Sequence, residues 1–190
     1  VTGVQTCALP IYAQMSSGYY EGSLEERRYG HIKLMRERSN RDVTQTGVVS
    51  KSSYVFGVMT KSIHKGCLFN GQKWEQGIAA TRGGREFCVR IEGAEMLLLE
   101  VDASTLEHMA DAHCGSTLKN IFRHGAHQFY DNKIFNRFIQ VVEKWLTQEQ
   151  HQDVVARPWL AMNHVAEREL LDLLLEILLR SEEHTSELQS

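Results

Sequence analysis

The sequence predicts a mainly β fold followed by α-helices, arranged as a β-barrel or jelly roll and then a helical pair. Three observations lead to this prediction. The glycines end at Gly125, and only Gly115 and Gly125 follow Gly93, so turns are frequent early in the chain and rare late in it. Short segments with strand chemistry fill the chain between Gly30 and Asp102. After Asp102, apolar residues recur at helical spacing instead.

The predicted strands are short and bounded by glycine, asparagine or serine turn signals. In the segment REFCVRI, apolar side chains fall on every second position, which is typical of a strand with one buried face. Little helix separates these segments, and this favours a sandwich or barrel over alternating strands and helices. The predicted strand segments are residues 31–38, 43–50, 53–60, 66–71, 85–91 and 95–101.

Three helices are predicted in the last part of the chain. Ser104 is a suitable N-cap for a short first helix, and Glu107 stands where its side chain completes a capping box. Asp131 is a suitable cap for the second helix, in which apolar residues recur at three- and four-residue steps over residues 134–145. The third helix is predicted to begin near Pro158, because proline suits a helix's first turn, and to end near residue 179.

Both ends of the chain are predicted to lie outside the native protein. The tail RSEEHTSELQS can be encoded by DNA whose reverse complement, in the adjoining frame, encodes the opening VTGVQTCALPI. That DNA resembles a common short-read sequencing adapter. Two complementary strings of this length rarely arise by chance, so we interpret residues 1–11 and 180–190 as adapter artefacts and residues 12–179 as the native part.

Composition favours a protein of the cytoplasm. The formal net charge is −3, and this excludes both a strongly basic nucleic-acid surface and an acidic tail. The native cysteines Cys67, Cys88 and Cys114 are odd in number and lack CxxC or zinc spacing, which fits a reduced compartment. The apolar run at residues 170–179 is too short and too charged to cross a membrane, so no membrane partner is expected.

Two segments of the predicted barrel carry a family resemblance. YVFGVM at residues 54–59 and LFNGQKWEQGIAATRGGREFCVRIEGAEMLLLEVDASTLEHM at 68–109 resemble the amino-terminal region of AraC-type transcription regulators, in particular the subgroup that includes the ethanolamine-operon activator. The similar features are an aromatic-x-Phe-Gly strand, a small-residue segment before the Gly83-Gly84 turn with a Glu-Phe strand after it, and a hydrophobic strand that ends in a short helix. These are turn and core signals, not catalytic residues.

The resemblance implies a cupin-like β-barrel over residues 12–102 and a helical dimerisation region over residues 103–179. In this family the barrel is the site for a small-molecule effector, and the helices pair two subunits. A separate carboxy-terminal domain with two helix-turn-helix motifs reads the DNA. The final predicted helix is leucine-rich and acidic, unlike a recognition helix, so we expect DNA contact only through a carboxy-terminal domain that this chain lacks.

Bulky residues on the predicted strand faces are the candidates for effector contact. Ligand pockets are mostly apolar and carry a few placed polar groups, and this set of residues supplies both. The same residues are equally suited to a plain core. The candidates are Tyr54, Phe56, Trp74, Phe87 and Arg90.

A small cupin-like metalloenzyme is the first alternative. Metal-binding cupins hold their ion through two histidines one residue apart, a nearby glutamate and a further histidine. The barrel segment contains only His31 and His64, far apart, and no HxH pattern. His124 and His127 form an HxxH pattern without the glutamate of the metalloprotease motif. We therefore expect no metal, no cofactor, no catalytic residue and no enzymatic activity.

The apolar stripe of the second predicted helix is the candidate dimer interface. Its residues Phe135, Phe138, Val142 and Trp145 form a face that must be covered either by the barrel and the third helix or by a second subunit. Periodicity leaves both covers open, and the resemblance favours a homodimer. The leading hypothesis is an effector-sensing and dimerisation fragment of an AraC-type regulator. The second alternative is a barrel that dimerises without binding a ligand.

Overall fold

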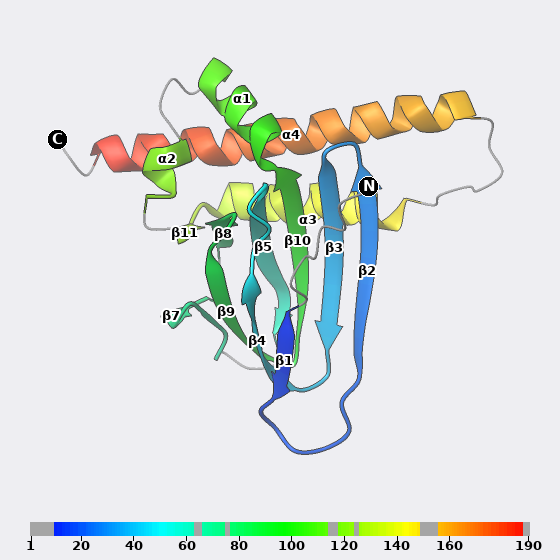
Figure 1. Cartoon of the computed structure of the whole chain (residues 1–190), viewed down its shortest axis with the longest axis vertical. Coiled ribbons are helices and arrows are strands. Elements are labelled where there is room, and N and C mark those ends of the chain that lie inside the picture. Colours follow the sequence, from blue (N-terminus) through cyan, green and yellow to red (C-terminus); the bar gives the residue numbers. More distant parts are fainter. Residues whose placement is uncertain are drawn as a thin grey trace, which may run out of the picture.

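The computed structural model describes residues 10–62, 66–74, 77–113, 118–123, 126–148 and 156–187. Strands occupy the first part of this described chain and helices the last (Figure 1). The elements in chain order are β1 (Ile11–Gln14), β2 (Gly22–Tyr29), β3 (Ile32–Ser39), β4 (Asp42–Val48), β5 (Ser53–Ser62), β6 (Leu68–Phe69), β7 (Gln72–Lys73), β8 (Ile78–Arg82), β9 (Glu86–Glu92), β10 (Ala94–Asp102), α1 (Ala103–His113), α2 (Leu118–Ile121), β11 (Ala126–Phe129), α3 (Asn132–Thr147) and α4 (Ala156–Glu187).

The described strands form two antiparallel sheets. The five-stranded sheet has the order β1-β4-β9-β6-β7, and the six-stranded sheet has the order β11-β8-β5-β10-β3-β2. Residues of both sheets pack together in one hydrophobic cluster, so the sheets face each other. This arrangement of a jelly-roll-like β unit followed by helices confirms the predicted fold class.

The central strand β10 of the six-stranded sheet contributes side chains to two different cores, because successive side chains of a strand point to opposite faces. In β10, Leu97, Leu99 and Val101 belong to the core that the sheet shares with the helices. Met96, which points the other way, belongs to the core between the two sheets. A strand buried on both faces reads as a nearly continuous apolar run, as MLLLEV does here.

Several strands lie outside the segments that the sequence predicted. β2 is rich in charged residues, and most of its side chains are at least partly exposed at the sheet edge. β8 reads IAATR, whose small side chains carry little strand preference, yet it pairs with β5 on one side and β11 on the other. β8 is therefore a strand because it pairs with strands that are distant in the sequence, and its local composition does not reveal that pairing.

The helices cover one face of the six-stranded sheet (Figure 1). α3 contacts β2, β3, β5 and β10, while α4 contacts α3, α1 and β2. The core between sheet and helices includes Tyr29 and Phe56 from the sheet, Phe138 from α3 and Leu174 from α4, all fully buried. The other face of the six-stranded sheet packs against the five-stranded sheet.

Asp131 caps α3, as the sequence predicts. Its Oδ1 accepts hydrogen bonds from the backbone amides of Lys133 at 2.8 Å and Ile134 at 3.1 Å. These two amides would otherwise have no acceptor in the first helical turn. Asp131 Oδ2 also lies 3.2 Å from Arg180 Nη1, which ties the start of α3 to α4.

The predicted cap of α1 is wrong by two residues. Asp102 accepts from the backbone amide of Thr105 at 3.0 Å, and the Ser104 hydroxyl donates to the same carboxylate oxygen at 2.5 Å. Glu107 instead accepts a hydrogen bond from the Tyr54 hydroxyl at 3.0 Å. Aspartate and serine are both strong N-caps, so sequence alone did not separate neighbouring positions.

The structure continues across both of the predicted adapter boundaries. β1 begins at Ile11, which pairs with Thr46 of β4. α4 extends past residue 180 and ends at Glu187. Residues at both boundaries therefore contact the fold.

Replacing Asp131 by Ala should lower the free energy of unfolding by about 1 kcal/mol at pH 7, because two amides lose their acceptor. Hydrogen bonds from the Ile134 and Lys133 amides hold the pKa of Asp131 below its ordinary value. The stabilisation is therefore present above about pH 4 and is lost as the pH falls through the folded-state pKa. Urea unfolding measures it, with Asp111→Ala on the exposed side of α1 as the control. Equal stability of D131A and the unsubstituted chain at pH 7 would contradict the cap.

Candidate functional site

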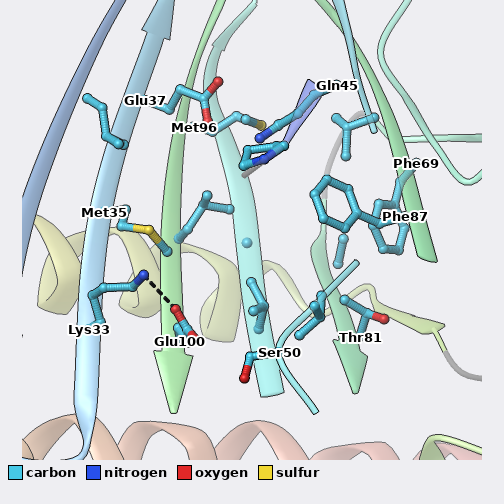
Figure 2. Close-up of a pocket in the computed structure, with 18 of the residues that line it drawn as sticks. Lys33, Met35, Glu37, Gln45, Ser50, Phe69, Thr81, Phe87, Met96 and Glu100 are labelled. Atoms are coloured by element: carbon cyan, nitrogen blue, oxygen red, sulfur yellow. Dashed lines mark ion pairs between the residues drawn. The ribbon is translucent and has the colours of Figure 1, made fainter. Parts of the chain in front are cut away.

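A cavity of about 250 Å³ lies between the two sheets (Figure 2). Its walls come from β3, β5, β8 and β10 of the six-stranded sheet and from β4 and β9 of the five-stranded sheet. The exposed lining residues Tyr12, Leu24 and Val48 lie on β1, β2 and β4, so the cavity meets solvent there. Its size is near the lower end of ligand pockets and suits a small molecule.

Aromatic and sulfur-containing side chains form the apolar part of the cavity lining, which we call the aromatic centre. Phe69 and Trp74 are buried with their ring centroids 5.7 Å apart, and Phe87 and Met96 lie in the same lining. The Trp74 indole N–H donates to the carbonyl of Gly77 at 3.2 Å, so this polar atom is satisfied within the chain. The centre is therefore suited to the apolar body of a ligand.

An ion pair lies at the end of the cavity nearer the helices (Figure 2). Lys33 and Glu100 are cross-strand partners on β3 and β10, and Lys33 Nζ lies 2.7 Å from Glu100 Oε2. The Ser53 hydroxyl donates to Glu100 Oε1 at 2.7 Å. Burial acts to raise the pKa of Glu100, but the hydrogen bonds from Lys33 and Ser53 outweigh burial and hold that pKa below its ordinary value. The pair is thus charged and internally satisfied at neutral pH.

Glu37 lies at the other end of the cavity (Figure 2). Glu37 is only 7% exposed to solvent. Tyr12 and Gln45 hydrogen-bond to its carboxyl group, and Gln45 Nε2 also donates to the Tyr12 hydroxyl at 3.1 Å. Burial raises the pKa of Glu37, and the hydrogen bonds from Tyr12 and Gln45 oppose that rise only in part. Burial and the nearby Glu37 also raise the pKa of Tyr12.

Of the five residues predicted to contact an effector, the structure brings Trp74 and Phe87 to the cavity. Arg90 lies on the outer face of β9, with its guanidinium 3.4 Å from the Glu92 carboxylate. The alternation of the strand is the reason. Because Val89 and Ile91 face inward, Arg90 between them faces outward.

Tyr54 and Phe56 lie on the face of β5 that is turned away from the cavity. Both are buried in the core beneath the helices. Burial, together with the hydrogen bond to Glu107, raises the pKa of Tyr54 to about 12. The cavity-lining residues of this strand are Val55 and Gly57, because the bulky side chains fill the helix side and the small ones leave space on the other.

Sequence reasoning missed the charged residues of the lining. Lys33, Met35 and Glu37 share one face of β3, and this face is turned toward the cavity. The signal was present, since two charged residues on the same face of a half-buried strand are unusual unless they are paired or functional. Their common face was visible from the spacing, but its direction was not.

The predicted dimer stripe of α3 is covered within the chain. Phe138, Val142 and Trp145 are buried, and Phe135 is partly buried against the same core. The sheet and α4 supply this cover. Of the two covers that periodicity left open, the intramolecular one is therefore seen here.

Histidines and acidic residues form no metal site in the part of the chain that the structure describes, where no group of three or more His, Cys, Asp or Glu side chains is placed to hold an ion. His127 lies in β11 with its ring centroid 4.6 Å from that of Phe129, and burial lowers the pKa of His127. His64, Cys114 and His124 lie outside the described residues.

The long helix α4 is not a membrane span. No helix among residues 156–187 or elsewhere in the described chain is long and apolar enough to cross a bilayer.

The arrangement of two sheets and a helical layer is also the fold of a solved AraC-like transcriptional activator. The solved structure of one of them, the AraC-like transcriptional activator CuxR, is similar to this chain with a TM-score of 0.61 at 9% sequence identity. The similarity covers 89% of this chain and 61% of the CuxR chain, so this chain spans less than two-thirds of that protein. No protein-family model and no curated protein matches the sequence.

Phe56, which points toward the helices, and Phe87, which lines the cavity, should differ in their contribution to stability. Phe56→Ala should lower the free energy of unfolding by about 3–5 kcal/mol, because Phe56 is fully buried between sheet and helices. Phe87→Ala, which removes a partly exposed side chain beside existing space, should cost clearly less. Urea unfolding of both variants measures the difference, and equal losses would contradict the assignment of the two faces.

Proposed function

We propose that this chain is the effector-sensing and dimerisation region of an AraC-type transcription regulator, and that it acts by binding and not by catalysis. The fold shared with CuxR carries this proposal, and the cavity between the sheets supports it. Operator binding is assigned to a carboxy-terminal helix-turn-helix domain of the parent protein. The regulator works in the cytoplasm, where it has access to DNA.

Recovering the uninterrupted gene tests the DNA-binding part of the proposal. A reading frame that continues past residue 179 into roughly a hundred residues with two helix-turn-helix patterns supports it. A frame that stops within a few codons overturns it. The same sequence tests the adapter origin proposed for residues 1–11 and 180–190, because native codons would then replace both strings.

The β2–β3 hairpin is the proposed connection between the effector and the helices. Lys33 lines the cavity two residues after His31, whose backbone amide donates to Glu167 of α4 at 2.8 Å. On the other side of the turn, the Tyr29 hydroxyl donates to the carbonyl of Trp145 in α3 at 2.6 Å. An effector that displaces Lys33 therefore acts on a turn that both helices hold, and changes the relative free energies of their arrangements.

Replacing Glu167 by Ala should expose the His31 amide. The amide loses its acceptor, so its hydrogen-exchange rate should rise at least tenfold, while the exchange of amides inside β3 stays unchanged. Glu176→Ala is the control, because Glu176 pairs with Arg137 of α3 and not with the hairpin. Unchanged protection of His31 in E167A would show that Glu167 does not hold this turn.

The outer face of α4 is the proposed dimer interface, in place of the α3 stripe. Leu160, Val165 and Leu179 are large apolar residues on this helix that stay exposed, with Val165 at 59%. A shallow hollow on the same helix is lined by Leu175 and Leu179 together with the charged residues Asp172, Glu176 and Arg180. An exposed apolar face on the final helix suits the subunit pairing that the AraC resemblance implies.

Replacing Val165 by Glu should shift the chain from dimer to monomer, because a carboxylate would be buried at the centre of the paired helices. Sedimentation velocity over a range of protein concentrations measures this shift. Tyr19→Glu is the matched control, since Tyr19 is 81% exposed and lies in the β1–β2 connection, where its carbonyl accepts a hydrogen bond from Arg41. A chain that is monomeric without any substitution would remove the dimer proposal.

A further inference from the structure

The charged side chains that line the cavity are unbalanced. Glu26, Glu37 and Glu100 line it, with Lys33 as the basic residue among its described lining. Lys33 is already engaged, because its ammonium group lies 2.7 Å from the Glu100 carboxylate. Two carboxylates therefore remain in excess, with Glu26 at the exposed edge strand β2 and Glu37 buried inside.

Glu37 is the more informative of these two carboxylates. It is 7% exposed, and the groups that hydrogen-bond to it, Tyr12 and Gln45, are both neutral. No described basic side chain forms an ion pair with it. Burial makes the ionised form of Glu37 costly, and a cation beside the carboxylate would offset that cost. A ligand that brings a positive charge therefore gains an interaction with Glu37 that a neutral ligand lacks.

The walls next to Glu37 suit the rest of such a ligand. Met96 is the cross-strand neighbour of Glu37 on β10 and lines the same cavity. Phe69 and Phe87 lie together at one side of the cavity in Figure 2, and Trp74 belongs to the same lining. Aromatic rings pack against hydrocarbon and attract cations over their faces. An anionic ligand would be repelled by the excess carboxylates. It would also lack a free cationic partner in the lining, because the Lys33 ammonium is paired with Glu100.

We propose that the cavity binds a small organic cation with an apolar body, whose ammonium group pairs with Glu37 and whose hydrocarbon part packs against the aromatic centre. This inference rests on the proposal that the cavity is an effector site, and it adds the chemical class of the effector. Glu37 is the residue that selects the charge of the ligand. The aromatic centre selects an apolar body over a fully polar one.

Three probes of similar shape and different charge test the inference: 2-phenylethylammonium, neutral 2-phenylethanol and anionic 3-phenylpropanoate. Binding to the full chain is followed by amide chemical shifts in solution, so that a bound probe is located by shifts at Gly57 and Trp74. The expected result is that the ammonium probe binds at least tenfold more tightly than the alcohol and the carboxylate. Equal affinities, tighter binding of the carboxylate, or no binding of the ammonium probe would overturn the inference.

Glu37→Gln is the decisive variant, because the amide keeps the shape and removes the charge. The variant should lower the affinity for the ammonium probe at least tenfold and leave the affinity for 2-phenylethanol unchanged. The unchanged affinity for the alcohol also shows that the cavity is intact. Glu86→Gln on β9, outside the lining, is the matched control and should change neither affinity. An E37Q variant that keeps the full preference for the ammonium probe would overturn the role of Glu37.

Different experimental results would overturn the effector proposal and this inference. A preference for the alcohol or the carboxylate inside the cavity overturns the cationic class and leaves an effector site standing. A cavity that binds no member of a fragment library of all three charges removes the effector site as well.

Discussion

The alternation of side chains along the six-stranded sheet is the constraint on which the rest of the structure depends. Successive residues of β5 point to opposite faces, so Tyr54 and Phe56 fill the core beneath the helices while Val55 and Gly57 leave space for the cavity. A shift of one residue in register would exchange these two sets. It would then place aromatic rings in the cavity and leave the helices without a core.

Polar contacts at one end of the β layers fix the helices on this sheet. The β2–β3 turn is tied to α3 through Tyr29 and to α4 through Glu167. The Glu169 carboxylate joins the two helices, because it accepts hydrogen bonds from the Trp145 indole at 2.9 Å and from Lys144 at 2.7 Å. The Lys33–Glu100 pair is at the same end of the cavity, so the cavity and the helical layer share a boundary (Figure 2).

The fold and the lining of the cavity carry different information about function. The likeness to CuxR at 9% identity concerns the arrangement of strands and helices. Ligand chemistry depends on individual side chains, and here these are an aromatic centre, one internal ion pair and the buried Glu37. The class of regulator is therefore proposed from the fold, and the class of ligand from the charges in the cavity.

The order of strands and then helices could be predicted from the sequence, because the period of an apolar pattern is a local property. The same holds for the Asp131 cap and for the two faces of strands such as β9, since each depends on residues close in the chain. Only the packed chain determines which face meets the helices and which meets the cavity, because residues far apart in sequence supply those surfaces. For that reason the α3 stripe became internal core, and Tyr54 and Phe56 turned away from the cavity. Lys33 and Glu37 came to line the cavity, although the sequence shows only that they share a strand face and not where that face points.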